Sequence, residues 1–303
     1  MKEITIVTAF FSLGGSRGRT DEQYLSYFKK WAKLKNRIIC YVESDMMKQK
    51  ILDFRDSIGL LEKTYVIIIN DFLSIDSLSY QNIKSTMDNK ALQTFITNPE
   101  SPCHSNPKYN YVMLLKSWCC QDASQYLNQI DEIIAWVDFG FNHEDCIIDS
   151  SSNFNYHWEY DFPDDKITIF PVRPLDNRPL FDIVLSGSVY LAGTIVVAPC
   201  YLWKDLWEMM RNNMARLNAC GLCDSDETVL LMCYRESPNL FNLIQTDFWG
   251  EGFRICGGQH LIPSKRRRIE EKDMWFFKAA HKQLIDRHLE HIGEYWKEQF
   301  YII

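Results

Sequence analysis

The sequence lacks any apolar run of the roughly 20 residues that a membrane-spanning helix needs, so no transmembrane segment is expected. It also lacks a surplus of basic residues: 33 Lys and Arg stand against 40 Asp and Glu, and the net charge is −7. Outside residues 265–268 no broad basic surface is implied, which argues against nucleic acid as a partner. There is no internal repeat and no long low-complexity segment, so a repeat architecture is not expected.

What the chain does have is the composition of a globular protein. Its 303 residues, 46% of them hydrophobic, allow one large or two modest domains with a substantial core. Several of the ten cysteines lie in apolar or helical patterns, such as Cys40 and the Cys119-Cys120 pair, which is typical of buried, reduced thiols in a cytosolic protein. Residues 4–11 follow Glu3 and are rich in β-branched side chains, which favours a first strand over a signal peptide. We therefore expect a cytoplasmic location.

Strand-like runs alternate with segments of helical period, which is typical of βαβ units around a mainly parallel sheet. The predicted strands lie at residues 4–11, 36–42, 64–70, 132–138, 166–171, 189–198 and 240–247. The predicted helices lie at 20–34, 46–58, 109–128, 201–217 and 226–236, with caps at Thr20 and within 224–226. Residues 71–107 are expected to hold a helix and a loop over the sheet face, and 149–165 to be irregular. The sequence predicts an α/β domain over residues 1–262.

The last part of the chain, residues 263–303, reads as a basic turn followed by an amphipathic helix. Apolar residues recur there at spacings of three and four, from Phe277 to Phe300. Packing of this face on the domain is one interpretation. A peripheral contact with the inner face of the cytoplasmic membrane, or a contact between subunits, is the other, and the oligomeric state is left open.

Asp138 is the first candidate site residue. It closes the apolar run 133–137 and is followed by Phe139 and Gly140. A carboxylate at the tip of a buried strand is well placed to hold a metal ion or a phosphate-bearing ligand at the edge of an α/β sheet. Asp-Phe-Gly also occurs in protein kinases, but the accompanying kinase motifs are missing. The simpler interpretation is that Asp138 caps a turn.

A second candidate is the acidic cluster formed by Asp224, Asp226 and Glu227 at a predicted helix start. These carboxylates could serve only the helix dipole. One of them could instead act as a general base toward an acceptor hydroxyl, and clustering would favour proton transfer by raising a pKa. Between the two candidates, the small pair Ala192-Gly193 within the predicted strand 189–198 permits close approach of a sugar ring or of another backbone.

Four stretches carry a resemblance to a known family: residues 5–11, 106–118, 135–143 and 224–232. Over most of residues 3–250 the sequence resembles the HtrL/YibB family of bacterial proteins, mostly described as glycosyltransferases linked with surface-polysaccharide and lipopolysaccharide loci. The order of the motifs also resembles, more distantly, nucleotide-sugar transferases of the GT-A fold. The resemblance implies a GT-A-like, Rossmann-like mixed sheet that is mainly parallel and flanked by helices.

The resemblance assigns roles to individual residues. Thr8, Ala9 and Phe10 match the loop that holds the nucleotide. Lys116 matches a basic helix residue near the donor, and Gly193 lies in the strand that lines the sugar. Asp226 and Glu227, with Asp224 beside them, match the catalytic acidic group on the acceptor side. Arg17 and Arg19, in a Gly-rich loop, could add cationic contacts to phosphate.

Asp138 matches the first carboxylate of the metal-binding Asp-x-Asp motif, but Gly140 stands where the second is expected. Another ligand is then needed, and His143, Asp145 and His260 are the candidates. The resemblance implies a metal-dependent hexosyltransferase that uses Mn²⁺ or Mg²⁺ and a nucleotide-sugar, by expectation UDP-linked, to extend a cell-surface glycan or lipopolysaccharide.

Three other interpretations stay open. A non-catalytic protein that binds a carbohydrate or a partner could retain the fold without Asp-x-Asp. Paired carboxylates also serve glycosidases. Finally, Cys220, Cys223, Cys256 and His260 are the residue types of a structural zinc site.

Overall fold

The computed structural model describes residues 3–13, 18–89, 95–127 and 132–264, and these form a seven-stranded sheet in the order β3-β2-β1-β4-β6-β5-β7. The strands are β1 (Ile4–Phe10), β2 (Ile38–Val42), β3 (Thr64–Ile68), β4 (Ile133–Val137), β5 (Ile167–Ile169), β6 (Ile195–Pro199) and β7 (Phe241–Leu243). Strands β1 to β4 pair in parallel, as do β5 and β7. Strand β6 runs antiparallel to both of its neighbours. The prediction of a mixed, mainly parallel sheet is confirmed.

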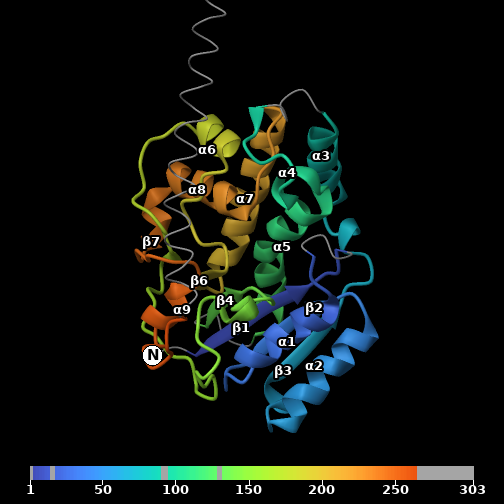
Figure 1. The fold of residues 1–303 in the computed structure, drawn as a ribbon, viewed down its shortest axis with the longest axis vertical. Coiled ribbons are helices and arrows are strands. Elements are labelled where there is room, and N and C mark those ends of the chain that lie inside the picture. Colours follow the sequence, from blue (N-terminus) through green and yellow to red (C-terminus); the bar gives the residue numbers. More distant parts are fainter. Residues whose placement is uncertain (1–2, 14–17, 90–94, 128–131, 265–303) are drawn as a thin grey trace, which may run out of the picture.

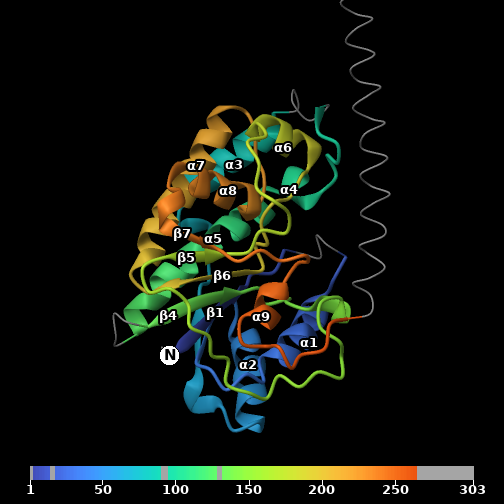
Figure 2. The same cartoon turned by 90° about the vertical axis from the view of Figure 1, so that its left-hand side faces the viewer.

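Helices cover both faces of this sheet (Figures 1 and 2). Above it in both views lie α3 (Ser77–Asp88), α4 (Pro102–Ser105), α5 (Pro107–Ala123), α6 (Leu180–Ser186), α7 (Leu202–Ala219) and α8 (Asp226–Glu236). Below it lie α1 (Asp21–Trp31), α2 (Asp45–Ser57) and α9 (Glu251–Ile255). Short 3₁₀ turns occur at Leu61–Lys63, Phe72–Ser74, Ser124–Tyr126, His143–Asp145 and Pro238–Leu240. The arrangement is a three-layer α/β domain.

The five strands β1, β2, β4, β5 and β6 are buried on both faces, and their side chains alternate between two cores. In β2, Ile38 and Cys40 pack in the core beneath the sheet, whereas Ile39 and Tyr41 pack in the core above it. This alternation follows from the two-residue period of a strand, and double burial explains why the strands read as continuous apolar runs. All ten cysteines are free thiols, and all but Cys103 and Cys220 are buried.

Helix starts follow the predicted caps. Thr20 forms a capping box with Gln23 at the start of α1, and α8 begins at Asp226, directly after Ser225. Among the described residues there is no helix both long and apolar enough to cross a lipid bilayer.

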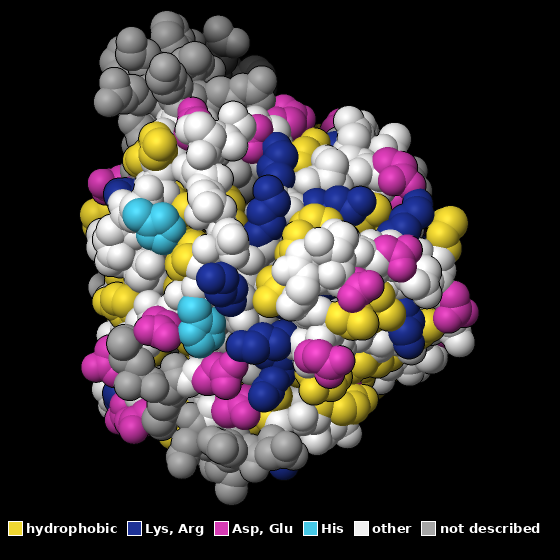
Figure 3. All heavy atoms as spheres, turned by 90° about the horizontal axis from the view of Figure 1, so that it is seen from below, with side chains coloured by type: hydrophobic (Ala, Val, Ile, Leu, Met, Phe, Trp, Pro, Cys, Tyr) yellow, Lys and Arg dark blue, Asp and Glu magenta, His cyan; other side chains and the backbone are white. Residues whose placement is uncertain are grey.

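The face below the sheet carries Lys and Arg side chains interspersed with Asp and Glu (Figure 3).

One predicted strand is partly wrong. Of residues 189–198, only the part from Ile195 onward is in a strand, and Leu191 makes a single isolated bridge to Pro171. Gly193 lies in the turn that precedes β6. Residues 71–107 contain α3 and α4, which agrees with the predicted helix and loop, whereas α6 and α9 were not predicted. The predicted basic turn at 265–268 and the C-terminal helix lie outside the described residues.

Candidate active site

The site forms where three segments of chain meet at one edge of the sheet. Strands β1 and β4 are parallel, so their carboxyl ends, at Phe10 and Val137, lie at the same edge. Strand β6 is antiparallel to β4 and therefore begins there, with Ile195 opposite Val137. The backbone N–H of Asp138 donates to the carbonyl of Thr194 at 3.0 Å. This is the edge at which open α/β sheets bind ligands.

Lys116, from α5, joins the two predicted acidic positions. Its Nζ lies 2.9 Å from Oδ1 of Asp138 and 2.8 Å from Oδ2 of Asp226, and it donates to the carbonyl of Gly193 at 3.0 Å. The ammonium thus donates hydrogen bonds to Asp226 and Gly193 and forms an ion pair with Asp138. Nε1 of Trp136 also donates to Oδ1 of Asp138, at 2.7 Å. Residues up to 110 positions apart in sequence thus form one compact cluster.

The electrostatics of this cluster are those of buried groups. Burial by itself lowers the pKa of Lys116, but the carboxylates of Asp138, Asp226 and Glu227 outweigh it and raise that pKa above its ordinary value. Burial, reinforced by Glu227, raises the pKa of Asp226 well above its ordinary value despite the ammonium beside it. The cluster therefore keeps Lys116 charged and holds a proton on Asp226 more readily than an exposed carboxyl would.

The packing of α8 against the turn before β6 requires a glycine at position 193. A Cβ atom at that position would lie 2.3 Å from Oδ2 of Asp226 and 3.2 Å from Cγ of Glu227. The absence of a side chain lets the start of α8 press against the turn before β6. The close approach expected at Gly193 is made by protein carboxyl groups, and Gly193 itself does not line the pocket.

A pocket of about 390 Å³ opens beside the cluster. Its wall includes three carboxylates (Asp21, Asp138 and Glu227), two cations (Arg19 and Lys116), the imidazole of His143, and aromatic rings that include Phe10, Phe11, Tyr24, Tyr109, Phe248 and Trp249. Pockets of this size bind small molecules, and apolar walls with a few polar groups are typical of them.

Comparison with known proteins shows to which protein family the chain belongs. The model of a bacterial protein family of unknown function, HtrL_YibB, matches residues 2–257. The chain belongs to the HtrL/YibB family. It is 24% identical over 288 residues to Protein HtrL of Escherichia coli (strain K12), an alignment that covers 88% of this chain and 96% of that protein. A solved structure named PaToxG Glycosyltransferase aligns with 78% of this chain and 71% of its own, at 11% identity and a TM-score of 0.37.

In this member of the HtrL/YibB family, many of the predicted site residues come together. Lys116, Asp138, Gly193 and Asp226 form the cluster, and Ala9, Phe10, Arg19, His143 and Glu227 line the pocket. Of the acidic residues at the start of α8, only Glu227 reaches the pocket wall. Asp226 lies behind it, bound to Lys116.

Other predicted residues lie elsewhere. Asp224 is buried and accepts hydrogen bonds from the N–H of Ser225 at 2.8 Å and the hydroxyl of Thr228 at 2.7 Å, so it stabilises the start of α8. Thr8 is buried within the sheet. His260 packs against the ring of Tyr156, 4.3 Å between centroids, and does not line the pocket. Arg17 lies outside the described residues.

The structure does not bring three metal ligands together. Among residues 3–13, 18–89, 95–127 and 132–264, no group of three His, Cys, Asp or Glu side chains is arranged to hold an ion. The zinc alternative is therefore wrong: Cys220 is exposed, whereas buried Cys223 accepts a hydrogen bond from Asn110 at 3.0 Å. Asp138 and His143 share the pocket wall without His260.

Tyr24 was missed by the sequence analysis, and it explains Gly140. A Cβ atom at position 140 would lie 2.9 Å from Cε1 of Tyr24. The tyrosine ring fills the space that a second carboxylate of an Asp-x-Asp motif would need. Trp136, two residues before Asp138, was also missed, although its position in the strand places it on the same face.

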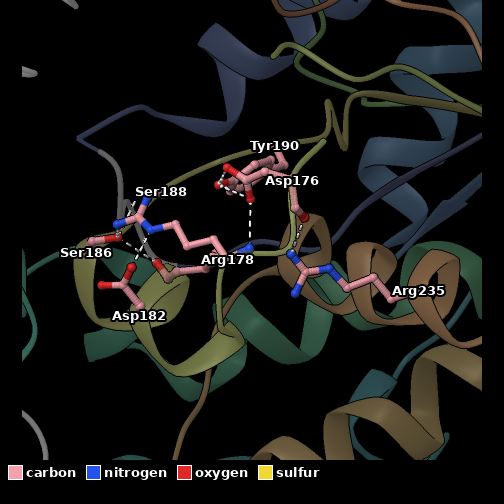
Figure 4. Close-up of polar contacts among 8 residues, drawn as sticks. Asp176, Arg178, Asp182, Ser186, Ser188, Tyr190 and Arg235 are labelled. Carbon is pink, nitrogen blue, oxygen red and sulfur yellow. Dashed lines mark hydrogen bonds and ion pairs between the residues drawn. The ribbon is translucent and has the colours of Figure 1, made fainter. Parts of the chain in front are cut away.

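A second polar cluster holds the segment between β5 and β6 that leads to Gly193 (Figure 4). Arg178 is its centre, with hydrogen bonds to Asp182, to Ser188 at 2.9 Å and to Ser186 at 3.1 Å. Asp176 accepts from the hydroxyl of Tyr190 at 2.9 Å, and its carbonyl accepts from Arg235 at 2.9 Å. Because Arg235 lies in α8, the cluster ties this segment to the helix that carries Asp226 and Glu227.

Proposed function

We propose that this protein is a glycosyltransferase that moves a sugar from a nucleotide-diphosphate sugar to a glycan acceptor. The observation that supports this most is the pocket at the carboxyl edge of β1 and β4, which is lined by Asp138 and Glu227 and by several aromatic rings. The base and sugar of a nucleotide-sugar stack on aromatic rings, and its diphosphate needs positive charge, which a metal ion held by such a carboxylate would supply.

The donor would lie along the end of β1. Ala9, Phe10 and Phe11 offer an apolar wall for the base, and Arg19 offers a cation to phosphate. Arg19 lies 3.9 Å from Glu144 at its nearest contact and is partly exposed, so this ion pair is weak and can be exchanged for a phosphate.

A divalent metal ion is part of the proposal because the pocket wall is acidic. Asp21, Asp138 and Glu227 outnumber Arg19 and Lys116, and Lys116 is already bound to carboxylates. Both contacts described for the Asp138 carboxylate use Oδ1, which leaves Oδ2 for a further ligand. Mn²⁺ or Mg²⁺, carried by the diphosphate, would neutralise the charge that develops on the leaving group.

Glu227 is the proposed general base that acts on the acceptor hydroxyl. An acceptor hydroxyl forms a bond to the anomeric carbon, the bond from that carbon to the phosphate oxygen breaks, and the nucleoside diphosphate leaves with the bonding electrons. Glu227 takes the hydroxyl proton. Direct deprotonation by a protein carboxylate predicts inversion at the anomeric carbon. A cell-surface glycan or lipopolysaccharide built on the cytoplasmic side is the proposed acceptor class.

The test is to incubate the protein with nucleotide-sugars in the presence of Mn²⁺ or Mg²⁺ and follow donor binding and donor hydrolysis by mass spectrometry. Glu227→Gln should retain binding and lower turnover by about 10²- to 10⁴-fold. Asp138→Ala should weaken binding, and Asp205→Asn, an exposed carboxylate on α7, is the control. Failure to bind any nucleotide with any metal would sink the proposal.

A non-catalytic binding protein is the second candidate, because Gly140 replaces the second carboxylate and Tyr24 occupies its space. It predicts ligand binding without donor hydrolysis or transfer, in the wild type and in Glu227→Gln alike. A glycosidase is distinguished by hydrolysis of simple glycosides without any nucleotide.

A further inference from the structure

Ser225 occupies the N-cap position of α8, but its side chain does not cap the helix. A serine at an N-cap ordinarily accepts a hydrogen bond from a backbone N–H of the first turn. Ser44, at the N-cap of α2, does so and accepts from the N–H of Met47 at 3.3 Å. Ser225 is buried and makes no such bond. Its hydroxyl therefore serves a different partner.

That partner is the carboxylate of Glu227. The Ser225 hydroxyl donates to Oε2 of Glu227, and because a hydroxyl has one proton, this bond uses all that Ser225 can donate. Glu227 lines the pocket, and its Oε1 accepts no hydrogen bond from the described parts of the chain. Sequences depart from local preferences such as capping chiefly at functional or strained sites. The departure at Ser225 thus coincides with the side chain of α8 that reaches the pocket.

The rest of Glu227 is held by packing rather than by hydrogen bonds. A Cβ atom at Gly193 would lie 3.2 Å from Cγ of Glu227, so the turn before β6 lies against the stem of this side chain. The preceding residue, Asp226, is buried and bound to Lys116 at 2.8 Å, which anchors the first turn of α8. Packing therefore fixes the stem of Glu227, and the hydroxyl of Ser225 fixes its carboxylate.

We propose that Ser225 is a positioning residue, whose hydroxyl holds Glu227 ready to act as the base in sugar transfer. This rests on the proposed function. The proton of the acceptor hydroxyl moves to Oε1 of Glu227, while Ser225 keeps its own proton and forms no bond to the substrate. A hydrogen bond donated to a carboxylate favours its ionised form, and a base must be ionised before it accepts a proton. The hydroxyl of Ser225 thus determines both the orientation and the charge of Glu227.

The experiment removes the hydroxyl with Ser225→Gly, because glycine is also favourable at an N-cap and the start of α8 is then preserved. Rates of donor turnover are measured as a function of pH with the nucleotide-sugar that the wild type hydrolyses. The kcat should fall about 10- to 100-fold, as expected for a lost hydrogen bond to a charged group. The acid limb of the pH profile should move to higher pH, and the donor KM should not change. The matched control, Ser44→Gly, removes a capping hydroxyl outside the pocket and should keep the wild-type rate and profile.

A double variant tests whether Ser225 acts through Glu227. In the Glu227→Gln background, Ser225→Gly should lower kcat no further, because the base is already absent. An equal loss of kcat in both backgrounds, or a wild-type rate and pH profile in Ser225→Gly, would overturn the inference and leave the proposed function in place. A wild-type protein that neither binds nor hydrolyses any nucleotide-sugar would remove both.

Discussion

A Cβ atom at Gly140 would lie 2.9 Å from Cε1 and 3.0 Å from Cδ1 of Tyr24. Gly140 has no positive φ, so space alone restricts this position. Gly140→Ala should therefore displace the Tyr24 ring and destabilise the protein by about 1–3 kcal/mol, as overpacking does. Adding Tyr24→Ala should cost less in the Gly140→Ala background than in the wild type, because the clash is then absent.

Urea unfolding of the two single variants and the double variant measures this coupling. Tyr65→Ala, a half-exposed ring on β3, serves as the control that should show no coupling to position 140. Strict additivity of Gly140→Ala and Tyr24→Ala would mean that the ring does not restrict this position.

Lys116 should be essential to stability because it is the buried partner of buried Asp226. Lys116→Met leaves that carboxyl group without its cation, and breaking one half of a buried pair costs about 3–5 kcal/mol. Lys116→Met combined with Asp226→Asn should recover part of that loss, since an amide requires no counter-charge. Thermal or urea unfolding gives the free energy of unfolding of the wild type, the two single variants and the double variant, which together form a double-mutant cycle.

The control for this cycle is Lys84→Met, which breaks an exposed pair with Asp88 on α3 and should change stability little. A Lys116→Met protein as stable as the wild type would show that the cluster contributes nothing to folding.

The sequence was sufficient for the strand order along the chain and for single positions such as the start of α8, because apolar runs and caps are local signals. It was not sufficient to place Gly193 in a turn, since the apolar residues on both sides of that turn are typical of one continuous strand. Nor could it show which carboxyl group faces the pocket: successive helix residues point about 100° apart, and only the packing of α8 places Glu227 outward and Asp226 inward. The Tyr24–Gly140 contact joins distant segments and has no local pattern.

Asp224 should make stability depend on pH. Burial raises the pKa of this carboxyl to about 7, against hydrogen bonds from Thr228 and Ser225 that lower it. In the unfolded chain the group loses its proton near pH 4. Between these values the folded state binds more protons than the unfolded state, so this group makes the free energy of unfolding fall as pH rises from about 4 to about 7. The loss is on the order of 4 kcal/mol.

Asp224→Asn should remove much of this dependence, because an amide can still accept from Ser225 and donate to Thr228 without ionising. The measurement is urea unfolding at several pH values between 5 and 8 for the variant and the wild type. Asp205→Asn, at an exposed position, should leave the slope unchanged. If the slope of Asp224→Asn equals that of the wild type, the carboxyl does not titrate in this range.

Trp249 should contribute to binding of the acceptor, since its side chain lines the pocket. The next residue, Gly250, has a φ of 70°, and a Cβ atom at that position would lie 2.7 Å from side-chain atoms of Phe141 and Ile147. Glu251, buried just beyond it, accepts from the N–H of Asp247 at 3.1 Å. The chain next to Trp249 is therefore restricted, and an aromatic ring with few rotatable bonds offers a stacking surface for a sugar at a small cost in side-chain entropy.

Trp249→Ala should therefore raise the acceptor KM by about tenfold, equivalent to about 1.4 kcal/mol, and leave donor hydrolysis by water unchanged. Initial rates of transfer to an array of glycosides, compared with rates of donor hydrolysis, separate the two effects. Trp249→Phe keeps a ring and should retain most of the affinity. An equal loss of transfer and hydrolysis in Trp249→Ala would instead place this residue on the donor side, because only a donor contact affects both reactions.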